Sequence, residues 1–162
     1  VEFPLWNQYP WQQHLGNPTL GVGFIGLDLG DNKVLGQAFA LYPYLLINIV
    51  NTPHFELKWK VGAGLSFFNK TYNRVFKEFG NTTGWSYYGP TCNNLIGSII
   101  NVHLPTAAHF NFPIKDNWAM HADLGYMHMS NGSVLQPNGG INILYASAGA
   151  SYKLHSKNAT NK

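Results

Sequence analysis

The stretch FELKWKVGAGLSFF, residues Phe55–Phe68, changes character at every second position. One row is fully apolar and consists of Leu57, Trp59, Val61, Ala63, Leu65 and Phe67. The other row is charged or very small and consists of Glu56, Lys58, Lys60, Gly62, Gly64 and Ser66. Period-two alternation is typical of a β-strand with two different faces. The stretch is also longer than the roughly 9–11 residues that a strand needs to cross a membrane. In a soluble protein the apolar row would face inward, and in a membrane barrel it would face lipid.

The composition favours the membrane alternative. Charged residues make up only 10% of the 162 residues, against about 25% in typical globular proteins, while aromatic residues reach 15% and glycines number 17. The longest apolar run, Ala40–Val50, is interrupted by Pro43 and is shorter than the roughly 18 residues of a membrane helix. We therefore expect an all-β, antiparallel, up-and-down transmembrane β-barrel, with residues 1–162 forming one domain.

The charges and the cysteine exclude several other classes of protein. The net charge of +3 is mild, Arg74 is the single arginine, and no basic cluster suggests nucleic acid. The single cysteine, Cys92, excludes an internal disulfide framework and argues against a structural zinc site. The chain begins at Val1 with no signal segment, so we expect a processed form or a fragment.

Six segments are predicted to be strands from their alternation and from the turn residues between them. They are Thr19–Leu29, Val34–Asn48, Phe55–Phe68, Leu95–Phe112, Trp118–Ser130 and Ile141–Leu154. The longer connections, 69–94 and 131–140, then lie at the same end, as the extracellular loops of outer-membrane barrels do. The smallest such barrels have eight strands, and residues 1–18 show no alternation, so we expect upstream strands to be missing. Residues 155–162 form a polar tail.

The candidate site lies where the fifth predicted strand ends. Its apolar row, which runs through Met120, Ala122, Leu124 and Tyr126, continues into His128 and Ser130. Asn142 belongs to the apolar face of the next strand. Residues two apart on a strand lie about 6.6 Å apart, and cross-strand neighbours about 4.5–5.5 Å. These three residues can therefore form a nucleophile, base and orienting group that face lipid, with oxyanion donors from Asn131 and the amides of Gly132 and Ser133. The alternative is a polar hairpin lip with ordinary turn chemistry.

The same segment resembles the active-site segment of a known family. The run His128-Met129-Ser130-Asn131-Gly132, followed by QPNGGIN at 136–142, resembles the H-x-S-N-A and Q-P-N-x-G-x-E motifs of PagL-type lipid A 3-O-deacylases. PWQQHLGNPTLGVGF, LGQAFALYPY and NNLIGSIIN also look like this wider family, so the resemblance covers Trp11 to Leu154. It implies an eight-stranded outer-membrane barrel that removes an ester-linked 3-hydroxyacyl chain from lipid A, with two of its strands upstream of this chain.

Carried over by position, the resemblance implies Ser130 as the nucleophile, His128 as the general base, Asn131 in the oxyanion hole and Asn138 as support for the loop. The departure is Asn142, where the family has glutamate. Asparagine can fix the tautomer of the histidine but cannot stabilise the imidazolium as a carboxylate does. We therefore expect either a slower hydrolase or a barrel without catalysis that serves as a structural or complex-forming subunit.

The expected partners follow from the same resemblance. They are lipid A or lipopolysaccharide in the outer leaflet of the bacterial outer membrane, with a homodimer or a larger outer-membrane assembly as a further alternative. We expect no cofactor, no metal ion and no nucleic acid. A third reading is a soluble barrel that binds an apolar ligand inside, as lipocalins do; it requires Trp59 and Phe67 to point inward.

Two further patterns are interpreted as structural. The run GVGFIG, Gly21–Gly26, fits a dinucleotide-binding pattern, but strand and turn residues follow it where a helix would be required, so its glycines are expected to ease strand curvature. His103 and His109 are expected to line a polar lumen. His121 and Asp123 are expected to form a buried pair there.

Overall fold

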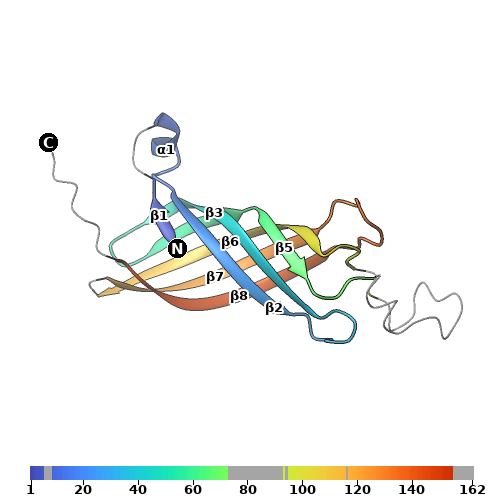
Figure 1. Cartoon of the computed structure of the whole chain (residues 1–162). Helices are drawn as coiled ribbons and strands as arrows, with labels where there is room; N and C mark the ends of the chain where they lie inside the picture. The colour runs from blue at the N-terminus through green and yellow to red at the C-terminus, as the bar shows by residue number, and fades with distance from the viewer. Residues whose placement is uncertain (6–8, 73–92, 94, 116, 155–162) are drawn as a thin grey trace, which may run out of the picture.

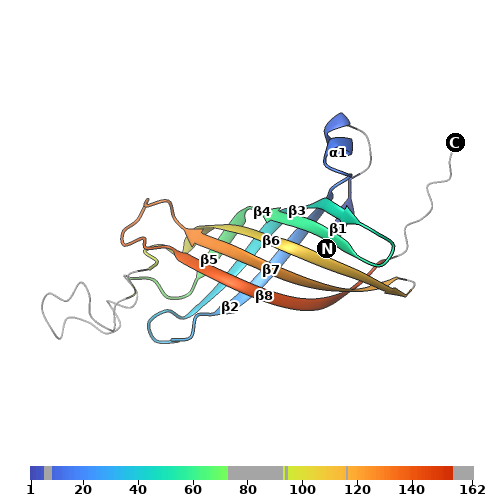
Figure 2. The same ribbon diagram turned by 180° about the vertical axis from the view of Figure 1, so that it is seen from behind.

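The protein is an antiparallel β-sheet that curls around an interior (Figures 1 and 2). The computed structural model describes residues 1–5, 9–72, 93, 95–115 and 117–154. Its elements are β1 Glu2–Pro4, α1 Pro10–His14, β2 Thr19–Asp28, β3 Gln37–Asn51, β4 Glu56–Gly62, β5 Gly64–Phe68, β6 Ile100–Lys115, β7 Trp118–Ser130 and β8 Ile141–Tyr152. The order is β1-β2-β3-β4-β6-β7-β8, and β5 continues β4 between β3 and β6. The all-β, antiparallel prediction is confirmed.

The start of the second predicted strand is wrong, because 34–36 belong to the turn before β3. The carboxylate of Asp31 accepts hydrogen bonds from the amides of Lys33 and Val34, and its carbonyl accepts those of Leu35 and Gly36. An Asp side chain that bonds the backbone after it stabilises a turn over a strand. Strand β3 therefore begins at Gln37.

The chain before β6 and the first eighteen residues also differ from the prediction. The Asn93 side chain accepts hydrogen bonds from the amides of Leu95 and Ile96, so β6 begins only at Ile100. The N-terminal part contains the short strand β1, which pairs with the start of β2, and the one-turn helix α1. Helix α1 begins at Pro10, a residue whose fixed φ suits the first helical position.

The two faces of the sheet have opposite chemistry. On β4 and β5 the side chains of Trp59 and Phe67 point outward, with exposed fractions of 48% and 42%. Ser66 is fully buried and the side chain of Lys60 is only 13% exposed, because both point into the interior. An apolar outside around a polar inside is the arrangement of a membrane barrel. The lipocalin-like reading, which needed the aromatic residues inside, is therefore wrong.

The interior contains a buried ion-paired cluster at mid-strand. Lys60 Nζ lies 3.0 Å from Asp123 Oδ2, and His109 Nδ1 donates to Asp123 Oδ1 at 2.6 Å. The expected His121–Asp123 pair does not form; the register places His109 directly opposite Asp123, and His121 packs on the His109 ring with centroids 5.6 Å apart. Lys60 also lies 4.7 Å from the ring centre of Tyr44.

The glycines of the GVGFIG run make room for tyrosine rings. Gly21 and Gly23 of β2 lie opposite Tyr44 and Tyr42 of β3. A Cβ at Gly21 would come within 2.3 Å of the Tyr44 ring, and one at Gly23 within 2.6 Å of the Tyr42 ring. These glycines therefore allow the tyrosine rings of β3 to pack closely on β2. From the sequence pattern, they were expected to ease strand curvature.

Near the loop end, side chains from both ends of the sheet meet in one apolar cluster. Its buried centre consists of Ala38, Phe68, Ile96, Met127 and Met129, against which Ile25 of β2 and Ile143 of β8 pack. The connections 29–36 and 131–140 leave the sheet at this end, as do residues 69–72 and 95–99, whereas α1 and the end of β8 lie at the other (Figure 1). Among the residues that the structure describes, no helix is long and apolar enough to cross a membrane.

Candidate active site

His128, Ser130 and Asn142 form a continuous hydrogen-bonded chain on the outward face of the sheet. His128 and Ser130 occupy alternate positions of β7, and Asn142 of β8 lies directly opposite His128. His128 Nε2 lies 2.9 Å from Ser130 Oγ, and His128 Nδ1 lies 2.7 Å from Asn142 Oδ1. The structure thus brings the three predicted residues together, and strand alternation with antiparallel register is sufficient to do so.

The acceptor at one end of this chain determines the protonation of the imidazole. Asn142 Oδ1 can only accept, so Nδ1 of a neutral His128 carries the hydrogen and donates it. Nε2 then carries the lone pair, and it accepts a hydrogen bond from the Ser130 hydroxyl. This is the tautomer in which a histidine can take a proton from a serine.

The loop after Ser130 is held by its own residues and by the segment before β6. The amide of Asn131 donates to Asn138 Oδ1 at 3.2 Å, and the amide of Gly140 donates to the carbonyl of Leu95 at 3.1 Å. Gly140 has φ +69°, and a Cβ there would lie 3.2 Å from His128 Cε1. A larger residue at 140 would therefore strain the backbone and press on the histidine.

The side chain of Asn131 is occupied in holding this loop. Its Nδ2 donates at 2.9 Å both to Ser98 Oγ and to the carbonyl of Leu135. In this geometry both hydrogens of Nδ2 are already donated within the protein. The amides of Gly132 and Ser133 have no hydrogen-bond partner among the described residues, and both residues have positive φ, 63° and 66°. Successive free amides in a turn are suitable donors for an anion.

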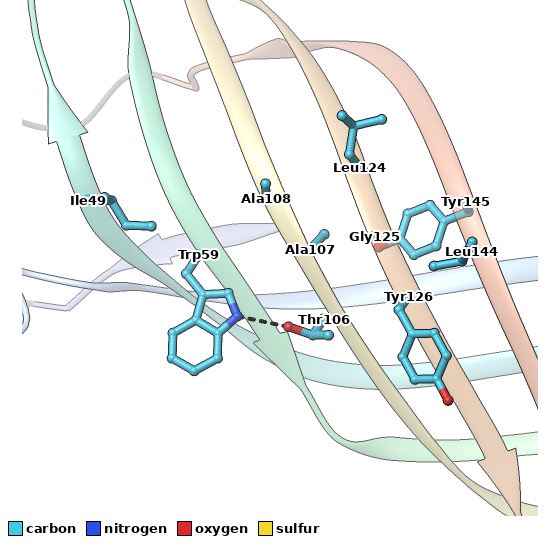
Figure 3. A pocket seen from close by; sticks show the side chains of 10 residues that line it. All are labelled: Ile49, Trp59, Thr106, Ala107, Ala108, Leu124, Gly125, Tyr126, Leu144 and Tyr145. Carbon is cyan, nitrogen blue, oxygen red and sulfur yellow. Dashed lines mark hydrogen bonds between the residues drawn. The ribbon is translucent and has the colours of Figure 1, made fainter.

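An apolar groove lies on the outward face, on the side of the site toward the start of β7 (Figure 3). Its volume is about 530 Å³. It is lined by Ile49, Trp59, Thr106, Ala107, Ala108, Leu124, Gly125, Tyr126, Leu144 and Tyr145. Trp59 Nε1 donates to Thr106 Oγ1 at 2.8 Å, which fixes the indole as one wall. Tyr126 lines the groove, and its hydroxyl also bonds Asn142, so the groove reaches the hydrogen-bonded chain of His128, Ser130 and Asn142.

Within the described ranges, no group of three or more His, Cys, Asp or Glu side chains is arranged to hold a metal ion. Cys92 lies outside the described residues. The groups assembled at the outward site are a hydroxyl, an imidazole, a carboxamide and backbone amides. Such a set can carry out acyl transfer.

Sequence reasoning missed two residues that contact this set. Ser98 bonds the side chain of Asn131 from 33 positions away, and nothing local in the sequence indicates that contact. Tyr126 shares the outward row with His128, but it was interpreted as part of an apolar row. Its position two residues before the histidine was the available signal, because such neighbours on a strand point the same way.

In a comparison with family models, residues 2–151 match the model described as lipid A 3-O-deacylase (PagL). The chain belongs to the lipid A 3-O-deacylase family. No curated protein and no solved structure matches the chain. The family match confirms the resemblance seen in the motif around Ser130 and extends it over nearly the whole chain. The lipid A 3-O-deacylase family is an outer-membrane enzyme family that acts on lipid A.

Proposed function

We propose that the protein is a bacterial outer-membrane esterase that removes the 3-O-linked hydroxyacyl chain of lipid A by serine–histidine acyl transfer. The observation that carries the proposal is the bonded chain from Ser130 Oγ through both nitrogens of His128 to Asn142 Oδ1. It faces outward, at the end where the long connections lie. A lipid in the outer leaflet presents its ester to that face.

In the proposed mechanism Ser130 Oγ attacks the ester carbonyl while His128 Nε2 takes the hydroxyl proton. The amides of Gly132 and Ser133 donate to the oxyanion, and Asn131 and Asn138 keep the loop in shape. Collapse of the tetrahedral intermediate breaks the bond to the sugar oxygen, which receives the proton from Nε2. Water, activated by the same histidine, then hydrolyses the acyl-enzyme and releases the 3-hydroxy fatty acid.

The groove is the proposed site of the acyl chain that is removed. It lies on the lipid side, where an acyl chain enters without leaving an apolar medium. From Ser130 to Leu124 the strand covers about 20 Å at roughly 3.3 Å per residue. The small side chain of Ala108 lines it, and the register places this residue between Trp59 and Leu124.

Filling the groove is expected to weaken substrate binding and leave the chemistry intact. Ala108→Phe should raise KM about tenfold with little change in kcat, because the lost contact corresponds to about two buried methylenes at ~0.8 kcal/mol each. Steady-state kinetics in detergent measure this. The matched control is Ala148→Phe, on the outward row of β8 outside the groove. Equal effects of the two variants would contradict the assignment of the groove.

Asn142 is the residue that lowers the expected rate. A neutral carboxamide orients His128 but gives the imidazolium a weaker hydrogen bond than a carboxylate does. Asn142→Glu is expected to raise kcat about tenfold, the value of replacing a neutral acceptor by a charged one. Asn142→Gln has the same length as glutamate without the charge and should give no gain. If the Asn142→Glu variant is no faster, residue 142 affects the rate only by orienting His128, and its charge contributes nothing.

The same residue supports the second candidate function, a family member without catalysis that serves as a structural or complex-forming subunit, in a homodimer or a larger outer-membrane assembly. Mass spectrometry of lipid A after incubation with the detergent-purified protein separates the two candidates. Loss of one 3-hydroxyacyl mass supports the esterase. An unchanged lipid A spectrum together with stable copurification of a larger assembly supports the subunit.

A further inference from the structure

Tyr126 places a second donor on the oxygen that orients the histidine. Its hydroxyl donates to Asn142 Oδ1 at 2.5 Å, and His128 Nδ1 donates to the same atom at 2.7 Å. The hydrogen-bonded chain therefore has four members: Tyr126, Asn142, His128 and Ser130. The proposed mechanism requires the last three and gives no task to the first.

The backbone register explains how the hydroxyl reaches this position. Tyr126 lies opposite Leu144 of β8, and His128 lies opposite Asn142, so the tyrosine is the diagonal neighbour of the asparagine on the outward face. A diagonal neighbour lies about 7–8 Å away, within reach of a long aromatic side chain. The ring lines the groove, and the hydroxyl points along β7 toward the end of that strand (Figure 3).

An asparagine in this position has a requirement that a carboxylate lacks. Its amide has one acceptor end and one donor end, and a rotation of the terminal group exchanges them. With Nδ2 toward the imidazole, the amide would donate to Nδ1, and the hydrogen of a neutral His128 would move to Nε2. Nε2 would then donate to Ser130 Oγ and could not accept its proton.

We infer that Tyr126 is a positioning residue that holds the oxygen end of Asn142 toward His128 and thereby selects the productive tautomer. The inference rests on the proposed acyl transfer. A phenolic hydroxyl is a better donor than acceptor, because its oxygen lone pair is delocalised into the ring. It therefore favours the oxygen end of the amide, and the Nδ1–H of the histidine favours the same end.

The kinetic test removes the hydroxyl in two backgrounds. Tyr126→Phe keeps the ring in the groove and is expected to lower kcat about fivefold at unchanged KM, the effect of one net hydrogen bond. In the Asn142→Glu background, where either carboxylate oxygen accepts, the same change should cost less than twofold. An equal loss in both backgrounds, or a change in KM alone, would overturn the inference.

A second measurement does not depend on hydrolysis. With ¹⁵N-labelled histidine in detergent, the His128 signals, assigned by their absence in His128→Gln, should report hydrogen on Nδ1 in the unmodified protein. Tyr126→Phe should shift them toward a mixture of the two tautomers. Tyr152→Phe, which alters another exposed tyrosine at the far end of β8, should leave them unchanged.

The two measurements separate failure of the inference from failure of the proposed function. Hydrogen on Nδ1 that is lost in Tyr126→Phe, in a protein that hydrolyses no lipid A, would sustain the positioning role and refute the esterase. Hydrogen on Nε2 in the unmodified protein, or signals that do not respond to Tyr126→Phe, would refute the positioning role whatever the activity.

Discussion

Ser130→Ala is expected to abolish release of the 3-hydroxyacyl chain from lipid A, with a fall in kcat of about 10³-fold or more. The reason is the position of its hydroxyl, 2.9 Å from His128 Nε2, the nitrogen that carries no hydrogen when Nδ1 donates to Asn142. Alanine removes the atom that forms the acyl-enzyme in the proposed mechanism and leaves the groove unchanged. Mass spectrometry of lipid A, sampled over a time course that extends well beyond complete turnover by the unmodified protein, measures the loss.

The fold should not change in this variant, since Ser130 contributes one partly buried hydroxyl. Heat-dependent migration on gels checks that the protein is folded, and Ser151→Ala, near the opposite end of the sheet, is the matched control with full activity expected. Deacylation by Ser130→Ala at a rate near that of the control would mean that another group is the nucleophile. The outward chain of hydrogen bonds would then have a different purpose.

The fold and the outward site could be predicted because one physical pattern determines both. Alternation along Trp118–Ser130 gave both ends of β7 and the face of each side chain. Antiparallel pairing then placed Asn142 beside His128. Turn chemistry was harder to judge. The apolar residues at 34–35 have the composition of a strand. They belong to a turn because their amides donate hydrogen bonds to the side chain and the carbonyl of Asp31.

Contacts that depend on register or on distant segments could not be predicted from the sequence. Asp123 has a histidine two positions before it, yet its partner His109 comes from β6, because the register of that pair decides which residues face each other. The bond between Asn131 and Ser98 spans 33 positions, and no local pattern encodes that distance.

The second large effect is expected in the interior. The carboxylate of Asp123 is only 7% exposed and bonds both Lys60 Nζ and His109 Nδ1. Asp123→Ala removes the negative partner and leaves the Lys60 ammonium, 13% exposed, in the lumen with the ring of Tyr44 as its remaining described contact. Breaking a buried pair from one side costs about 3–5 kcal/mol, because the other charge stays buried and uncompensated.

Urea-induced unfolding in detergent or lipid vesicles measures this change in the free energy of unfolding. The control is the double variant Asp123→Leu with Lys60→Met, which removes both charges and keeps the volume. It should recover most of the lost stability, since replacing a whole buried pair by apolar residues is often close to neutral. If the single variant is as stable as the unmodified protein, water in the lumen solvates Lys60, and burial of its ammonium carries no such cost. If Asp123→Ala is destabilised and the double variant does not recover the lost stability, the bond from His109 to Asp123 holds β6 against β7 independently of the charge on Lys60.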